Sequence, residues 1–75
     1  MRDKRERFVE LAEARVTKAS QTLRLIGNLA NLNNYEYDES DVQKIMSALD
    51  AEMKLLRSKF HTALRKKQNH GFKLA

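Results

Sequence analysis

Apolar side chains recur every three or four residues along two long stretches of the chain, and this spacing is typical of amphipathic helices. In the first stretch, about residues 3–31, an unbroken heptad repeat comprises Val9, Ala12, Val16, Ala19, Leu23, Ile26 and Ala30. In the second, about residues 41–66, the repeat comprises Val42, Met46, Leu49, Met53, Leu56, Phe60 and Ala63. The chain has no proline to interrupt either stretch. The sequence therefore predicts an all-α protein with two long helices.

On each predicted helix the apolar residues form a stripe that is wider than the heptad repeat alone, which we call the seam. Such a width is expected for helices that pack against more than one neighbour. Additional apolar residues flank the two repeats: Phe8, Leu11, Leu25 and Leu29, then Ile45, Leu55 and Leu64. The chain has 75 residues and no cysteine, and below about 70–80 residues a single core rarely supplies more than a few kcal/mol. We therefore expect an antiparallel helical hairpin that dimerises into a four-helix bundle. The alternative is a compact three-helix monomer with a break near Gly27.

Gly27 interrupts the first stretch without changing its apolar phase, which Leu29 and Leu32 continue. Since a glycine within a helix costs roughly 1 kcal/mol against alanine, we expect it to have a structural use. One possibility is the close approach of a neighbouring helix. The other is that the first helix stops at Ile26 and a short helix follows through Leu32.

Three asparagines mark the break between the two helices, which we expect to be a loop over residues 32–40. Paired asparagines end helices because their side chains compete for backbone hydrogen bonds. Ser40 and Gln43 then match a capping box, with Asp38 as an alternative N-cap. The predicted organisation is thus a helical hairpin over residues 1–67 and a flexible tail over residues 68–75.

Charge is segregated along the chain, which carries a net charge of +5. Residues 1–34 have a net charge of +3, residues 35–53 have −5, and residues 54–75 contain seven bases and no acid. An antiparallel hairpin would bring both chain ends together and form one basic pole. The bases predicted to bind nucleic acid there are Arg2, Lys4, Arg5, Arg7, Arg57, Lys59, Arg65, Lys66 and Lys67.

No pattern of residues points to catalysis, so we expect that the protein is not an enzyme and uses no cofactor or small-molecule substrate. His61 and His70 are two ligands where a zinc site needs three or four. The acids near residue 40 lack the spacing of a calcium loop and fit helix capping instead. No apolar run approaches the roughly 20 residues of a membrane span, and the charged first residues do not fit a signal peptide. The expected location is the cytoplasm, without a membrane partner.

Several short segments resemble a group of small uncharacterised bacterial proteins that are often carried on plasmids, phages and other mobile elements. The matching segments are Arg7-Phe8-Val9, Leu11-Ala12-Glu13, Arg15, Lys18, Leu25-Ile26-Gly27-Asn28-Leu29, Asn31, Asn34-Tyr35-Glu36-Tyr37, Asp41-Val42 and Lys44-Ile45. The resemblance covers roughly residues 5–60. It implies a helical hairpin in a mobile-element setting, and it transfers neither an activity nor functional residues.

Two functions remain open at this point. The first is a self-associating helical module, expected as a homodimer, that binds nucleic acid electrostatically through its basic pole. The second is a protein-binding adaptor or inhibitor that acts through the loop end. In that case Tyr35, Glu36 and Tyr37 form the contact surface, because exposed tyrosine is common among residues that dominate binding energy.

Overall fold

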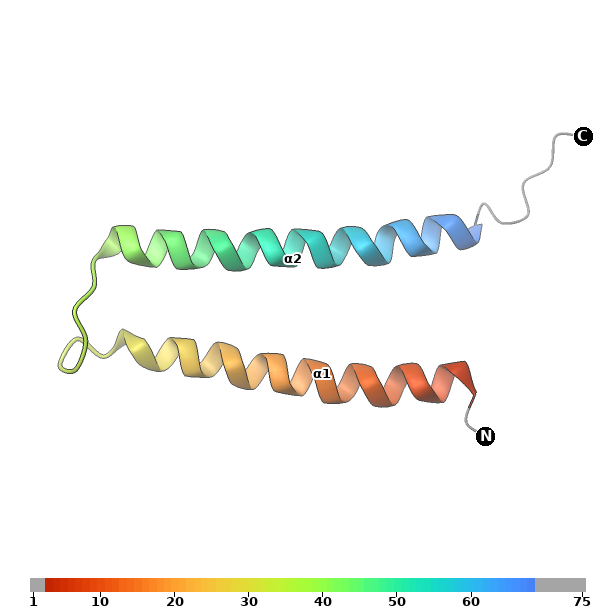
Figure 1. Ribbon diagram of the computed structural model, residues 1–75, viewed down its shortest axis with the longest axis horizontal. Coiled ribbons are helices and arrows are strands. Elements are labelled where there is room, and N and C mark those ends of the chain that lie inside the picture. Colours follow the sequence, from red (N-terminus) through yellow and green to blue (C-terminus); the bar gives the residue numbers. More distant parts are fainter. Residues whose placement is uncertain (1–2, 69–75) are drawn as a thin grey trace, which may run out of the picture. The chain divides into compact units, whose positions relative to one another are not determined.

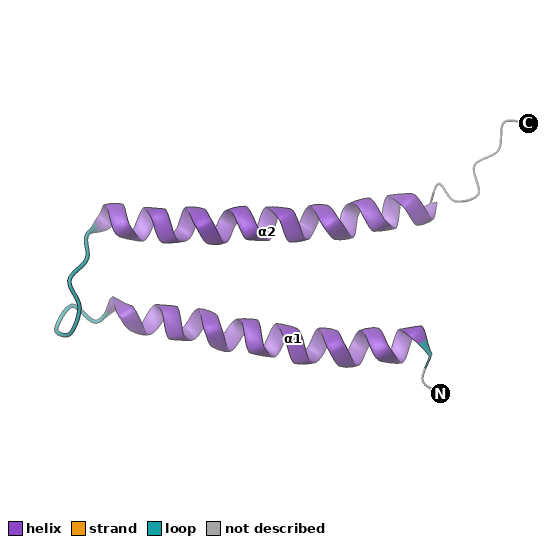
Figure 2. Ribbon diagram, viewed as in Figure 1, coloured by secondary structure: helices purple, strands orange, loops and turns teal. Residues whose placement is uncertain are grey.

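The computed structural model describes residues 3–68, and within them every regular element is a helix. Helix α1 spans Lys4–Gly27, the 3₁₀ helix η1 spans Asn28–Ala30, and helix α2 spans Glu39–Gln68 (Figures 1 and 2). The chain divides into two units, the first ending at Glu36 and the second beginning at Tyr37. The prediction of an all-α chain with two long helices is confirmed.

Helix α1 begins at a side-chain cap provided by Asp3. The Asp3 backbone is extended, and its carboxylate accepts a hydrogen bond of 2.8 Å from the backbone N–H of Glu6. The Asp3 carbonyl then accepts the N–H of Arg7 at 3.1 Å, which starts the helical hydrogen-bond ladder. The cap satisfies a donor that would otherwise lack a partner within the helix, so α1 starts at Lys4, close to the expected position.

Helix α1 ends earlier than the predicted residue 31. The backbone N–H of Asn28 donates to the carbonyls of both Arg24 and Leu25, as expected where an α-helix tightens into a 3₁₀ turn. Gly27 keeps right-handed helical angles, with φ −60° and ψ −29°. The alternative prediction, a first helix that stops at Ile26 with a short helix after it, is confirmed in part: α1 ends at Gly27, and the short helix η1 ends at Ala30, not at Leu32.

The close approach of a neighbouring helix at Gly27 stays a prediction. Apart from the backbone of its own helix, a Cβ atom at Gly27 would meet no described heavy atom within 4 Å. Its φ is also negative, so an L-amino acid can adopt the same backbone conformation.

The asparagine-rich break forms a hydrogen-bonded turn centred on Asn31. The side-chain oxygen of Asn31 accepts the N–H of Asn33 at 2.9 Å. Its carbonyl accepts the N–H groups of Asn34 at 3.1 Å and Tyr35 at 3.0 Å. These bonds replace the helical ladder, as expected for asparagine at a helix end.

Helix α2 begins with a reciprocal pair of hydrogen bonds between Asp38 and Asp41. The Asp41 N–H donates to the Asp38 carboxylate at 2.9 Å, and the Asp38 N–H donates to the Asp41 carboxylate at 3.0 Å. The predicted capping box of Ser40 and Gln43 is therefore wrong, and the alternative N-cap Asp38 is used. The two carboxylates each accept a hydrogen bond from one backbone N–H group. The cap, Asp38, therefore lies two residues before the predicted cap, Ser40.

The remaining boundaries shift accordingly, with a connection over residues 31–38 in place of 32–40. Helix α2 starts at Glu39, not at 41, and continues to Gln68, not to 66. Three bases in its last turn favour this extension because they lie at the negative end of the helix dipole. Of the tail predicted over residues 68–75, Gln68 is helical, and the rest lies outside the described residues.

No side chain among residues 3–67 is buried. The few half-buried residues are Val9, Ala12, Ser20, Ile26, Tyr37 and Leu49. Large apolar side chains of both stripes stay exposed, for example Leu23 at 50%, Leu56 at 48% and Phe60 at 53%. The described part of a single chain therefore has two amphipathic helices and no hydrophobic core.

Candidate nucleic-acid interface

The C-terminal half of α2 concentrates positive charge on one continuous helical segment. Residues 54–68 contain six bases and no acid, whereas the preceding part of α2 carries Glu39, Asp41, Asp50 and Glu52. The six basic side chains are Lys54, Arg57, Lys59, Arg65, Lys66 and Lys67, and all are exposed. Such a segment creates a positive potential that attracts polyanions.

Part of this charge lies on one side of α2, which we call the basic face. Its residues, Lys54, Arg57, Ser58, His61, Thr62 and Arg65, line one open recess on the helix. Lys54, Arg57, His61 and Arg65 follow one another at intervals of three or four residues, and Ser58 and Thr62 are adjacent to members of this series. Successive turns of the helix therefore present all six on the same side. From Lys54 to Arg65 the face is about 17 Å long, at 1.5 Å per residue.

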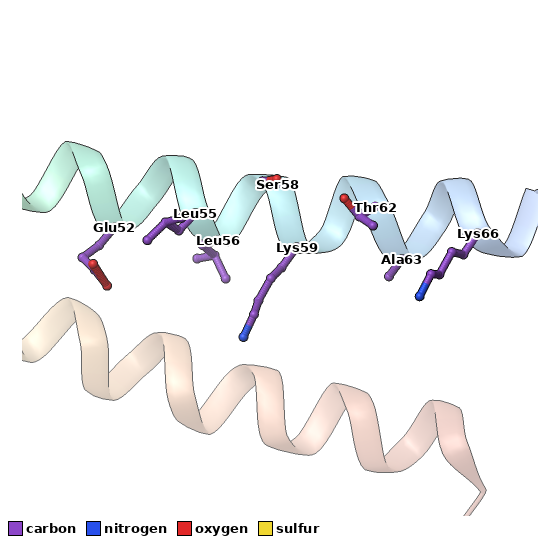
Figure 3. A pocket seen from close by; sticks show the side chains of 8 residues that line it. All are labelled: Glu52, Leu55, Leu56, Ser58, Lys59, Thr62, Ala63 and Lys66. Atoms are coloured by element: carbon purple, nitrogen blue, oxygen red, sulfur yellow. The ribbon is translucent and has the colours of Figure 1, made fainter.

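Two other predicted bases, Lys59 and Lys66, lie on a different side of α2. They line a second recess with Glu52, Leu55, Leu56, Ser58, Thr62 and Ala63. Figure 3 shows Lys59 directed to the same side of the helix as Leu56 and Glu52. This side mixes apolar groups with both signs of charge, so it is suited to packing against another helix more than to following a phosphate backbone.

Lys67 differs from the other bases because it continues the apolar repeat. It follows Phe60 by seven residues and Ala63 by four, and residues at these spacings share a helix face. The five α2 bases predicted for one site therefore occupy three positions around the helix, and only Arg57 and Arg65 belong to the basic face.

The N-terminal bases lie in the first two turns of α1. Lys4, Arg5 and Arg7 are exposed, and the Arg5 guanidinium lies 5.9 Å from the centroid of the Phe8 ring. Contact with a ring face holds a cation near one orientation by electrostatic attraction. Arg2 lies outside the described residues. The union of these bases with those of α2 in one pole stays a prediction.

Lys54 and His61 belong to the basic face, but the sequence analysis did not include them among the nucleic-acid-binding residues. Their spacing could have identified them, because Lys54, Arg57, His61 and Arg65 follow one another at intervals of three, four and four residues. This is the spacing of one helix face. The balance of charge along the chain does not reveal this relationship, because it carries no information on position around the helix.

The residues of the protein-binding alternative differ in exposure. Tyr35 is 49% exposed, Glu36 is exposed and Tyr37 is half-buried. The backbone N–H of Tyr35 belongs to the Asn31 turn, so this turn fixes the start of the segment. The adaptor or inhibitor function stays a prediction.

The described residues include no candidate metal site and no candidate membrane span. Within residues 3–68 there is no group of three or more histidine, aspartate or glutamate side chains that could hold a metal ion. None of the helices in that range combines the length and the apolar character needed to cross a membrane.

No protein-family model matches the chain, and no curated protein or solved structure shows significant similarity to it. The resemblance to proteins of mobile elements therefore stays a prediction.

Proposed function

We propose that this chain is a non-enzymatic, self-associating helical module that binds nucleic acid electrostatically, as an accessory or regulatory protein of a mobile element. The basic face of α2 carries the proposal. It combines three exposed bases and a histidine on one side of a helical segment that contains no acid.

The chemistry of the basic face suits a phosphate backbone. Lysine and arginine neutralise phosphates and release counterions, and this release makes affinity depend on salt. The hydroxyl groups of Ser58 and Thr62 lie between the bases and can donate hydrogen bonds to phosphate oxygens. Contacts to phosphates carry no sequence information directly, so we expect little preference between sequences.

The exposed apolar stripes support self-association. In the proposed arrangement the two helices form an antiparallel hairpin, and two hairpins form a four-helix bundle that buries both stripes. The supporting observation is that no side chain of residues 3–67 is buried within the single chain. Two copies would also present two basic faces to one nucleic acid.

A gel-shift titration at 50 and 200 mM salt tests nucleic-acid binding. Six or more phosphate contacts predict an affinity loss of about a thousandfold or more between these concentrations. Binding should be similar for unrelated sequences of equal length. Absence of binding at 50 mM salt, or a strong preference for one sequence, would contradict the proposal.

Matched variants locate the binding surface. Lys54→Gln with Arg65→Gln removes two charges from each basic face, four in the proposed dimer, and should reduce the slope of log affinity against log salt by about 4. Arg15→Gln with Arg24→Gln removes the same charge from α1 and should change the slope much less. Equal losses in the two double variants would show that net charge, and not the basic face, determines binding.

A further inference from the structure

The exposed stripe of α2 has the layout of a helix that pairs with another helix. Its seam contains Met46, Met53 and Phe60 at one heptad position and Val42, Leu49, Leu56 and Ala63 at the other. One edge of the seam carries Gln43, Asp50, Arg57 and Leu64, and the other carries Ile45, Glu52, Lys59 and Lys66. In paired helices, such edge positions select the partner and its orientation.

We infer that the α2 stripe binds the α2 stripe of a second copy in an antiparallel arrangement with one defined register. In this register Met53 faces Leu56 of the second copy, Leu49 faces Phe60, and Met46 faces Ala63. The inference rests on the self-association proposed above and adds its interface. Because the arrangement is two-fold symmetric, each facing pair occurs twice.

Charge complementarity identifies the second copy as the partner. Antiparallel helices place like edges together, so Asp50 faces Arg57 of the second copy on one edge. Glu52 faces Lys59 of the second copy on the other. Both facing pairs have opposite signs, and therefore the register is favoured whichever edge of α2 the second α2 occupies in a four-helix bundle.

The neighbouring registers are disfavoured by the same residues. A shift of one heptad in one direction places Asp50 against Asp50 and Glu52 against Glu52 of the second copy. The opposite shift places Arg57 against Arg57 and Lys59 against Lys59. Like charges facing across an interface suppress these alternatives.

A parallel pair of α2 helices is also less favourable. It retains attraction between Glu52 and Arg57, but it leaves Asp50 and Lys59 opposite apolar residues. It also aligns the acid-free segments, residues 54–68, side by side, whereas the antiparallel pair sets each of them against the acidic half of the other helix. The opposite charges of the two halves of α2 thus favour the antiparallel orientation.

Complementary charge-reversal variants test the pairing. One variant carries Asp50→Arg and Glu52→Lys, and the other carries Arg57→Asp and Lys59→Glu. Each variant alone then faces like charges and should dimerise at least tenfold more weakly than the unmodified chain. A one-to-one mixture restores opposite charges at every facing pair and should form a heterodimer. Sedimentation equilibrium at low salt without nucleic acid measures all three samples.

A control separates this effect from net charge and from misfolding. Lys54→Asp with Arg65→Glu changes the charge as much as the second variant does, but away from the seam, and should leave dimerisation nearly unchanged. Recovery in the mixture shows that both variants can fold. A monomeric unmodified chain would overturn self-association as well as this interface. A dimeric chain whose two variants keep full affinity, or fail to recover on mixing, would overturn the interface alone.

A spin-label distance tests the register. The chain has no cysteine, so Lys44→Cys provides a single attachment site outside the seam. In the proposed register, position 44 lies level with position 65 of the second copy, which separates the two labels by about 32 Å along the helix axis. The shifted registers give axial separations of about 21 and 42 Å, and a parallel pair gives almost none. Any of these other values would overturn the proposed register.

Discussion

At the scale of single residues, the start of α2 shows how two carboxylates outcompete a nearby hydroxyl. Asp38 and Asp41 exchange hydrogen bonds with each other's backbone N–H groups, and Ser40 lies inside the helix that they cap. Both serine and aspartate are good N-caps, so residue preference alone does not choose between them. Each cap has a residue that can return the hydrogen bond, Gln43 for Ser40 and Asp41 for Asp38. The Asp38 cap is favoured because both of its acceptors are charged carboxylates at the positive end of the helix dipole.

Asp38→Ala should lower stability because it removes this cap, at a cost of about 1 kcal/mol. For a domain of this size the loss corresponds to a decrease in Tm of roughly 4–8 °C at a fixed protein concentration. Thermal melts followed by circular dichroism measure it. Asp38→Asn keeps a side-chain acceptor and should retain most of the stability, and Ser40→Ala should have little effect. A larger loss for Ser40→Ala than for Asp38→Ala would indicate that Ser40 is the cap.

At the scale of elements, the sequence predicted the helices well because apolar periodicity extends over many turns. The ends were predicted less well. Leu29 and Ala30 continue the apolar phase of α1, but periodicity does not distinguish an α-helix from the 3₁₀ turn that contains them. The basic residues of the site could be predicted by type. Their division among three positions around α2 does not follow from the order of charges along the chain, because residues close in sequence point in different directions.

Gly27→Ala should stabilise the end of α1. Gly27 has right-handed helical angles, and an added methyl group would meet no described atom, so the substitution gains helix propensity of up to about 1 kcal/mol. An increase in helical circular dichroism and in Tm is expected. Ala14→Gly, in the middle of α1, provides the matched opposite change and should lower both. A decrease in Tm for Gly27→Ala would instead show that a second copy packs closely against this position.

At the scale of the whole molecule, the described residues of one chain form helices without a core. Most of the stability of helices in proteins comes from packing of their apolar faces, and ordering each residue costs about 1–2 kcal/mol of backbone entropy. Two long helices with exposed stripes are therefore expected to gain stability from a further packing surface. In the proposed function, a second copy supplies it.

This dependence predicts a Tm that rises with protein concentration. If folding requires dimerisation, a tenfold increase in concentration stabilises the dimer by about 1.4 kcal/mol and should raise the Tm of the roughly 150-residue assembly by about 4 °C. Melts over a hundredfold concentration range provide the test. The Asp50→Arg/Glu52→Lys variant should melt at a lower temperature at every concentration. A constant Tm across the range would show that the monomer is stable by itself.

The exposed stripes also bear on how long the protein survives in a cell. Proteases act on chains that are open, and the rate of degradation follows the population of the open form when opening is fast. A chain whose packing depends on a second copy is open whenever it is alone. Newly made molecules would therefore be removed quickly while they are scarce and would persist once they are numerous enough to pair. The steady-state amount of protein would then increase more steeply than its rate of synthesis, so that weak expression leaves almost none.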